Sequence, residues 1–286
     1  MKRDFKFLKY QGCGNDFIIA DEMSGRKTPD SDRSRLATIL THRRFRIGAD
    51  GVIFVERAPG ADGSMRLFEP AGNEADMCGN GIRCVADYLF RKLNKSELDV
   101  MTRDGLKHIR RVGSEYRVDM GPVRTTLRDL RPYIRHKGAP ADSMMNIEVR
   151  AGPRLLKGAL VNSGEPHLVF RSRRLRSEDV EDLGNLVNAD KRKFPKGVNL
   201  NFVQVEGPHT IRVRTYERGV YAETLACGTG ATAAAAVSLL KKWVKPGSVE
   251  VLPPGGRLTV EIEKNGRAYM TGPAECEFEG RLSVEV

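Results

Sequence analysis

Alternating apolar and polar residues predict short strands over most of the chain, and helical periodicity replaces the alternation in a few places. The helical segments are 31–43, with Ser31 as the capping residue, 177–187, and the stretches that follow Cys78 and Cys227. The predicted strands lie at 5–10, 17–20, 52–55, 66–69, 98–101, 108–112, 116–120, 155–161, 168–170, 200–205, 214–217, 249–252, 258–263, 268–272 and 274–279. Many short strands with interspersed helices are typical of the α/β (α+β) class.

Two segments share an acidic loop, a Cys-Gly-x-Gly sequence and a helical pattern. They read EPAGNEADMCGNGIRCVAD at 69–87 and ERGVYAETLACGTGATAA at 217–234. In both, the cysteine lies where the chain turns into a helix, and the glycines let backbone N–H groups approach a ligand closely. Such a helix terminus lowers the pKa of a thiol and also binds a carboxylate.

The spacing around the cysteines indicates an internal repeat. Gly48 precedes Cys78 by as many residues as Gly197 precedes Cys227, and the same order of strand, turn and strand lies between them. Two copies of one unit predict two domains and a cleft with a thiol on each side. Gly121-Pro122 interrupts the strand pattern between the copies, and we place the domain boundary there.

The composition limits the class of protein. Of the 286 residues, 40% are hydrophobic and 30% are charged, as in a globular protein. The basic N-terminal residues do not lead into the long apolar run of a signal peptide, and the apolar run at 233–240 is too short to span a bilayer. We therefore expect no membrane association. Five cysteines without zinc-like clustering predict reduced thiols, no metal site and a cytoplasmic location.

The net charge of +11 allows two interpretations. Basic residues cluster at 41–46, 125–137 and 171–176, as they would on a nucleic-acid-binding surface. No recognition-helix, zinc-finger or aromatic RNA-binding sequence accompanies them. The pattern therefore favours a solvated basic exterior that attracts anionic substrates, and we expect no nucleic-acid partner.

The cysteine segments and several further motifs resemble those of the diaminopimelate epimerases, a family of cofactor-independent amino-acid racemases and epimerases. The matching motifs, in chain order, are KYQGCGNDFII, GADGV, MCGNGIRC, VDMG, GEPH, GVNLNFV, YERGV and ETLACGTG. The resemblance implies two pseudo-symmetric domains, each a mixed or antiparallel sheet wrapped around a central helix. The implied domains are 1–121, completed by the C-terminal strand 275–286, and 122–274.

The same resemblance implies epimerisation of LL-2,6-diaminopimelate to the meso isomer, a step of lysine and cell-wall precursor biosynthesis. Cys78 and Cys227 would be the two acid/base thiols on opposite faces of the α-carbon, one removing a proton as thiolate and the other delivering one as thiol. Glu217 and His167 match positions that assist the thiols. The matched substrate-binding positions are Asn15, Gly79, Asn80, Gly81, Asn199, Arg218, Gly228, Thr229 and Gly230.

Two glutamates depart from the family pattern at substrate-contacting positions. Glu69 and Glu165 stand where the family usually has asparagine, and carboxylates there would repel a distal carboxylate of the substrate and attract a distal cation. One interpretation is a racemase of a cationic amino acid such as lysine, ornithine, arginine or histidine. The other is that both glutamates pair with Arg218 or nearby basic residues and leave the epimerase pocket functional.

Two further classes of function remain in view. A cysteine hydrolase would need an oriented nucleophile and base, but it would not explain a second thiol in a repeated setting. A non-catalytic amino-acid-binding protein would carry thiols that are not activated. The sequence has no nucleotide-binding loop, metal cluster or pyridoxal-type motif, so we expect a small amino-acid substrate and no cofactor. The resemblance permits a homodimer.

Overall fold

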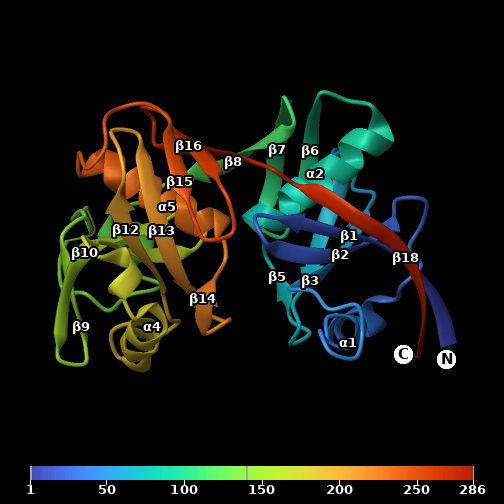
Figure 1. Ribbon diagram of the computed structural model, residues 1–286, viewed down its shortest axis with the longest axis horizontal. Helices are drawn as coiled ribbons and strands as arrows, with labels where there is room; N and C mark the ends of the chain where they lie inside the picture. The colour runs from blue at the N-terminus through green and yellow to red at the C-terminus, as the bar shows by residue number, and fades with distance from the viewer. Residues whose placement is uncertain (1, 140, 286) are drawn as a thin grey trace. The chain divides into compact units, whose positions relative to one another are not determined.

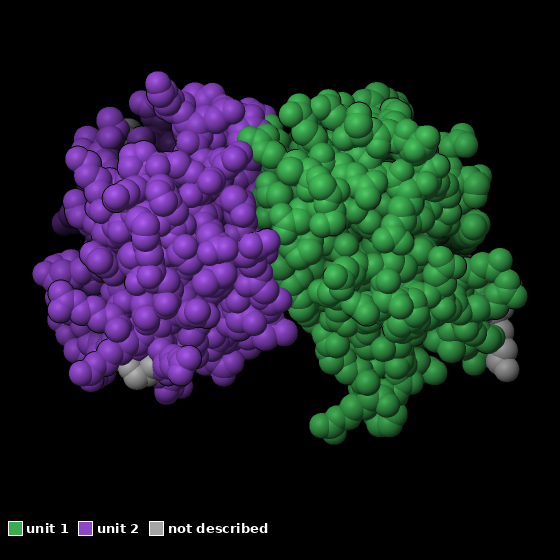
Figure 2. All heavy atoms as spheres, turned by 45° about the horizontal axis from the view of Figure 1, so that its top comes forward, with its two compact units in different colours: residues 1–119, 271–286 green, residues 120–270 purple. Residues whose placement is uncertain are grey.

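The computed structural model describes residues 2–139 and 141–285, and the chain divides into two compact units (Figures 1 and 2). Unit 1 comprises residues 1–119 and 271–286, and unit 2 comprises residues 120–270. The sequence-based divisions lie after residues 121 and 274. The difference at the first division falls within one strand, Glu115–Pro122, which runs through the Gly121-Pro122 turn instead of ending before it.

Unit 1 is formed by a single sheet and two helices. Its strands are β1 (Lys2–Gly12), β2 (Asn15–Glu22), β3 (Gly51–Glu56), β4 (Gly63–Phe68), β5 (Glu74–Ala75), β6 (Glu97–Thr102), β7 (Gly105–Val112), β8 (Glu115–Pro122) and β18 (Glu275–Glu285). The helices are α1 (Asp30–Leu40) and α2 (Gly79–Leu93). Most strand pairs are antiparallel, whereas β2–β3 and β4–β6 are parallel, so the sheet is mixed.

Unit 2 repeats this plan with a second set of elements. Its strands are β9 (Ile147–Ala151), β10 (Arg154–Asn162), β11 (Pro166–Arg171), β12 (Asn199–Val205), β13 (Thr210–Glu217), β14 (Ala222–Thr224), β15 (Val249–Leu252), β16 (Leu258–Ile262) and β17 (Arg267–Gly272). The helices are α3 (Leu127–Leu130), the 3₁₀ turn η1 (Leu175–Ser177), α4 (Val180–Ala189) and α5 (Gly228–Leu240). The parallel pairs β11–β12 and β13–β15 correspond to β2–β3 and β4–β6.

One helix lies at the centre of each unit. Helix α2 contacts β1, β2, β4 and β6 of unit 1, and α5 contacts β10, β11, β12, β13, β15 and β16 of unit 2 (Figure 1). The alanines of α5 are buried on every side because strands surround the helix, and small side chains allow the close approach. The expected architecture of two similar domains, each with a sheet around a central helix, is therefore confirmed.

Some sequence-based element boundaries need correction. Helix α1 starts at Asp30 with Pro29 as N-cap, so Ser31 lies within the first turn and does not cap the helix. Proline is tolerated at the start of a helix because the backbone N–H that it lacks would have no acceptor within the helix there. The last strand, β18, pairs antiparallel with β1 over nearly its full length and so completes unit 1. Among the described residues, no helix is long and apolar enough to cross a membrane.

Candidate active site

In unit 1 the centre of the candidate site is Cys78, the N-cap of α2. Its backbone is extended, with φ −137° and ψ 120°, and its sulfur accepts a hydrogen bond from the N–H of Gly81 at 3.5 Å. A cysteine therefore takes the place that serine, threonine or asparagine usually holds at a helix start. The helix dipole and the exposed N–H groups favour a negative charge at this sulfur.

Asn15, at the start of β2, faces the Cys78 sulfur. The thiol lies 3.6 Å from Asn15 Oδ1, which also accepts a hydrogen bond from Asn80 Nδ2 at 3.1 Å. The Asn15 amide donates to Asp50 Oδ2 at 2.6 Å, and this bond fixes which end of the amide points at the thiol. Asp50 thus orients a residue of the site.

Arg83 holds the first turn of α2 from inside unit 1. Its side chain is fully buried and donates to Asn80 Oδ1 at 3.0 Å, to the Gly79 carbonyl at 3.1 Å and to the Pro273 carbonyl at 3.0 Å. A buried guanidinium with these acceptors fixes the Gly79-Asn80 backbone in place. Sequence reasoning missed this residue, although a lone arginine within an otherwise apolar helix face was a usable signal.

In unit 2 the corresponding centre is Cys227, the N-cap of α5. Its sulfur accepts a hydrogen bond from the Gly230 N–H at 3.3 Å and lies 3.4 Å from Thr229 Oγ1. A side chain on Gly230 would place its Cβ 2.6 Å from Asn201 Oδ1 and 3.3 Å from the Cys227 sulfur, so glycine is required here. Cys227 is only 6% exposed, less than Cys78, which is partly exposed.

Glu217, the last residue of β13, acts on Cys227 electrostatically. Burial raises the pKa of the Cys227 thiol well above its usual value, and the Glu217 carboxylate raises it further. The hydroxyl of Thr229 and the N–H of Gly230 oppose this effect because they donate to the sulfur. Thr224 in turn donates to Glu217 Oε1 and holds the carboxylate in place.

His167, on β11, is fully buried and approaches Cys227 only through Thr229. Burial, together with the positive charge of Arg218, lowers the pKa of His167 to about 3, so the ring is neutral near pH 7. Asn201 Nδ2 donates to His167 Nδ1 at 2.9 Å, and the Asn201 amide is oriented by Leu168 and Thr215. The neutral ring therefore carries its proton on Nε2, which lies 3.0 Å from Thr229 Oγ1.

This tautomer defines the direction of a hydrogen-bond chain. Because His167 Nε2–H donates to Thr229 Oγ1, the Thr229 hydroxyl keeps its own proton for the Cys227 sulfur. A longer contact of 3.4 Å, from Asn199 Nδ2 to His167 Nε2, is the weaker one and does not decide the tautomer. Sequence reasoning missed Asn201, although its spacing from Asn199 along β12 predicts that both face the same side.

The two unusual glutamates have different partners. Glu165 forms an ion pair with Arg218, whose Nε lies 2.8 Å from Glu165 Oε2 and whose Nη2 also contacts this oxygen. Glu69 instead accepts a hydrogen bond from Asn73 within its own turn. The expected pairing with Arg218 is thus observed for Glu165.

The predicted site residues other than Glu69 therefore gather into two groups, one in each unit. Unit 1 brings together Cys78, Gly79, Asn80, Gly81 and Asn15, while unit 2 brings together Cys227, Gly228, Thr229, Gly230, Glu217, His167, Asn199, Glu165 and Arg218. Within the part of the chain that the structure describes, no cluster of three or more histidine, cysteine or carboxylate side chains could hold a metal ion.

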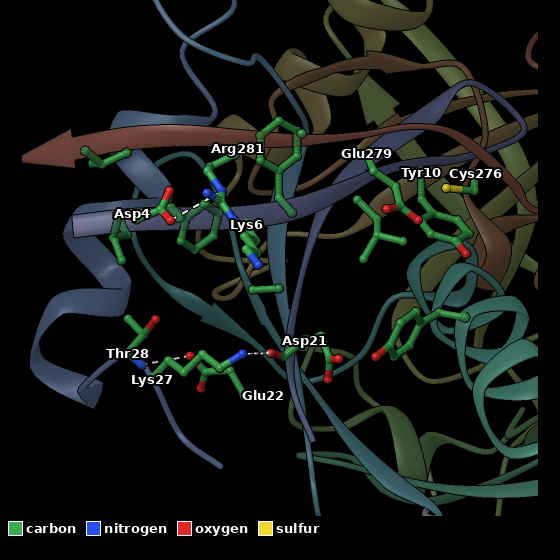
Figure 3. A pocket seen from close by; sticks show the side chains of 18 of the residues that line it. Asp4, Lys6, Tyr10, Asp21, Glu22, Lys27, Thr28, Cys276, Glu279 and Arg281 are labelled. Atoms are coloured by element: carbon green, nitrogen blue, oxygen red, sulfur yellow. Dashed lines mark hydrogen bonds and ion pairs between the residues drawn. The ribbon is translucent and has the colours of Figure 1, made fainter. Parts of the chain in front are cut away.

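A cavity of about 1070 Å³ lies elsewhere in unit 1. Its described lining comes mainly from β1, β2 and β18 and includes Lys6, Tyr10 and Cys276 but none of the predicted site residues. Figure 3 shows charged groups of both signs around it, with Arg281 paired to Asp4. The candidate site is therefore identified by the chemistry at the two helix starts and not by this cavity.

Comparison with known proteins identifies related sequences and folds. The sequence model of the family described as diaminopimelate epimerase matches residues 7–126 and 159–277. Diaminopimelate epimerases of Methanocella arvoryzae and Archaeoglobus fulgidus are both 37% identical to this chain, covering 98% and 97% of it and 97% and 96% of their own lengths.

Solved structures extend the similarity in fold. A phenazine biosynthesis protein of the PhzF family from Bacillus anthracis superposes with a TM-score of 0.67 at 16% identity, covering 99% of this chain and 100% of its own. A hydroxyproline epimerase from Agrobacterium vitis gives 0.66 at 15% identity, covering 99% of this chain and 93% of its own. At such low identity these two structures show the fold alone.

Proposed function

Because the chain belongs to the diaminopimelate epimerase family, we propose that it is an isomerase that converts LL-2,6-diaminopimelate to the meso isomer. The observation that carries the proposal is the pair of cysteines at the starts of α2 and α5, each with a sulfur that accepts a backbone N–H. The product would serve the biosynthesis of lysine and of cell-wall precursors.

The reaction needs one base and one acid at the same carbon. One cysteine, as thiolate, takes the α-proton, and the other, as thiol, delivers its proton to the opposite face of the carbanion. The two sulfurs exchange protonation states in each turnover, and no cofactor enters the balance. A single base would tend to return the proton to the face from which it came, so inversion favours two groups.

In unit 2 the surroundings of Cys227 suit a group that begins as the protonated thiol. Burial and the Glu217 carboxylate keep the proton on the sulfur. Once the proton has been delivered, the Gly230 N–H and the Thr229 hydroxyl stabilise the thiolate that remains. His167 stays neutral and acts as a positioning residue, because its Nε2–H fixes the direction in which the Thr229 hydroxyl donates.

The N–H groups at the starts of α2 and α5 would bind the substrate α-carboxylate. A helix terminus contributes up to ~2 kcal/mol to the binding of a nearby anion, and a hydrogen bond to a charged group about 1.5–3 kcal/mol. The same donors stabilise the negative charge that spreads onto this carboxylate when the α-proton leaves. Gly79, Asn80 and Gly81 in unit 1, and Gly228, Thr229 and Gly230 in unit 2, are the residues assigned to this role.

We place the protein in the cytoplasm and infer a homodimer as its assembly. The cytoplasmic location is supported by the chemistry, because both thiols must stay reduced and each of the five cysteines is a thiol in the structure. The homodimer rests on the family resemblance alone. Gel filtration with light scattering tests it, and a mass near 31.8 kDa, that of one chain, would contradict it.

Proton NMR of the reduced enzyme in D₂O tests the proposed reaction. LL-diaminopimelate should lose its α-proton signal and yield the meso isomer, whereas Cys78→Ala should abolish this conversion. L-lysine, L-ornithine, L-arginine and L-histidine are offered in parallel. Exchange with one of these cationic amino acids, and not with diaminopimelate, would contradict the proposal and identify a cationic amino-acid racemase.

A further inference from the structure

The ion pair between Glu165 and Arg218 is connected through neighbouring residues to the surroundings of the Cys227 thiol. Arg218 directly follows Glu217, and its backbone N–H donates to Asn199 Oδ1 at 2.8 Å. On the other side of the pair, Ser163 donates to the Thr229 carbonyl at 2.8 Å, and a Cβ at position 164 would lie 3.3 Å from the Thr229 methyl group. The segment before Glu165 is thus anchored at Thr229, which lies 3.4 Å from the Cys227 sulfur, and Arg218 is anchored at Asn199, which lies 3.4 Å from His167.

The ion pair leaves hydrogen-bonding groups available on both Arg218 and Glu165. Arg218 Nε and Nη2 both contact Glu165 Oε2, and Arg218 Nη1 donates to the Lys196 carbonyl at 3.0 Å. A guanidinium has five N–H groups, so two remain without a partner among the described residues. Within the same part of the chain, Glu165 Oε1 accepts no hydrogen bond, and the glutamate side chain is 39% exposed.

We propose that this ion pair stays intact when substrate binds and recognises an amino-acid head group, with Glu165 Oε1 binding the distal ammonium and Arg218 the distal carboxylate. The inference rests on the proposed function, since diaminopimelate carries an ammonium and a carboxylate at both ends. The pair and the distal head group each have no net charge, and their donors and acceptors are complementary. An asparagine at position 165 could not supply the negative charge for the ammonium.

The competing arrangement is that Glu165 occupies the place of the substrate carboxylate and must leave Arg218 before substrate binds. The two arrangements predict opposite effects of Glu165→Gln. If Glu165 binds the ammonium, its neutralisation weakens the binding of every ligand with a distal ammonium. If Glu165 competes with the substrate, its neutralisation strengthens the binding of diaminopimelate.

Two analogues of diaminopimelate separate the contributions of the distal groups. L-2-aminopimelate lacks the distal ammonium, and L-lysine lacks the distal carboxylate. We would measure kcat/KM for LL-diaminopimelate and the inhibition constants of both analogues in the D₂O exchange assay. Glu165→Gln should lower kcat/KM about tenfold, mainly through KM, and weaken inhibition by L-lysine by a similar factor. Inhibition by L-2-aminopimelate should be unchanged or tighter, because Arg218 then lacks its internal counter-charge.

Glu223→Gln is the matched control. Glu223 forms a bidentate ion pair with Arg214 in the same unit, and Arg214 also donates to the carbonyls of Leu175 and Glu178 near α4. This variant should match wild type on all three ligands. Equal weakening of all three ligands by Glu165→Gln, or tighter binding of LL-diaminopimelate, would overturn this inference and leave the proposed function in place. No exchange of LL-diaminopimelate by the wild-type enzyme would overturn both.

Discussion

The two units place the same reactive group at the same point of the same fold but surround it differently. Cys78 is partly exposed, and its neighbours are amides, Asn15 and Asn80, held by Asp50 and Arg83. Cys227 is buried beside a carboxylate and a hydroxyl that is oriented by a neutral histidine. The two units therefore share the position of the thiol at a helix start. The side chains around each thiol differ, and they set its protonation state.

This difference matches the needs of a reaction in which one thiol gives a proton and the other takes one. Identical surroundings would give both sulfurs the same preferred state, and one of the two would then always start in the wrong form. Here the two sulfurs differ, because Cys227 is buried and has a raised pKa, whereas Cys78 is more exposed. The two thiols therefore need not prefer the same protonation state.

Removal of either thiol should lower epimerisation by roughly 10³-fold or more, since each supplies acid/base catalysis of about 10²–10⁴-fold. Cys78→Ala and Cys227→Ala should still differ in one respect. Each variant keeps the thiol on one face, so it should exchange the α-proton of only one isomer without inversion, and the two variants should favour opposite isomers. NMR in D₂O with LL- and meso-diaminopimelate measures this, and the same isomer preference in both variants would contradict the two-base assignment.

Replacement of Glu217 should lower the pKa of Cys227 and leave the reactivity of Cys78 unchanged. Glu217→Gln removes the negative charge that raises the pKa of Cys227, so this pKa should fall but stay above its usual value because of burial. Alkylation of Cys227 by iodoacetamide should begin at lower pH, and kcat should fall about 10²-fold because the carboxylate that assists proton transfer at Cys227 is lost. Peptide mass spectrometry follows both cysteines, with Cys78 as the internal reference and Glu223→Gln as the control variant.

His167 should make the stability of unit 2 depend on acid pH. Its folded-state pKa, about 3, is depressed below the ordinary value of 6.5, so the unfolded chain binds the proton more readily. The stability that His167 contributes is present above pH 6.5 and is lost as pH falls toward 3. By pH 5 the loss should be about 2 kcal/mol, at 1.36 kcal/mol per pH unit.

Fluorescence of Trp243, the single tryptophan of the chain, reports urea unfolding of unit 2. The stability of His167→Gln should change less between pH 6.5 and 5 than that of wild type. The exposed His209, also in unit 2, provides the matched control, and His209→Gln should follow wild type. Equal pH dependence in all three proteins would show that His167 is not held neutral by the fold.

The smallest expected effect is that of Thr229, which transmits the orientation of His167 to the sulfur. Thr229→Val removes the hydroxyl that donates to Cys227 and leaves His167 Nε2–H without its acceptor. We expect kcat to fall about tenfold, corresponding to the loss of one hydrogen bond to a charged group. Thr229→Ser should restore most of the rate, and no difference between the valine and serine variants would contradict the proposed direction of the chain.

The sequence alone determined the repeat, the two helix-capping cysteines and the family. The helix starts are local features, because they depend on the few residues at Cys78 and Cys227 and on the helical pattern that follows each. The same locality explains the two misplaced element ends, the helix start at Ser31 and the strand end before Gly121. A propensity for capping or turning is weak, and strand pairing and the preceding Pro29 overrode it.

Only the tertiary structure decided what surrounds each sulfur. Asp50 and Asn201 are distant in sequence from the groups that they orient, and no motif connects them. The protonation of His167 depends on its complete burial, and the partner of Glu165 depends on how β11 and β13 are arranged around α5. Charges and desolvation act through space, so their effects on pKa and specificity follow from distances that the order of residues does not contain.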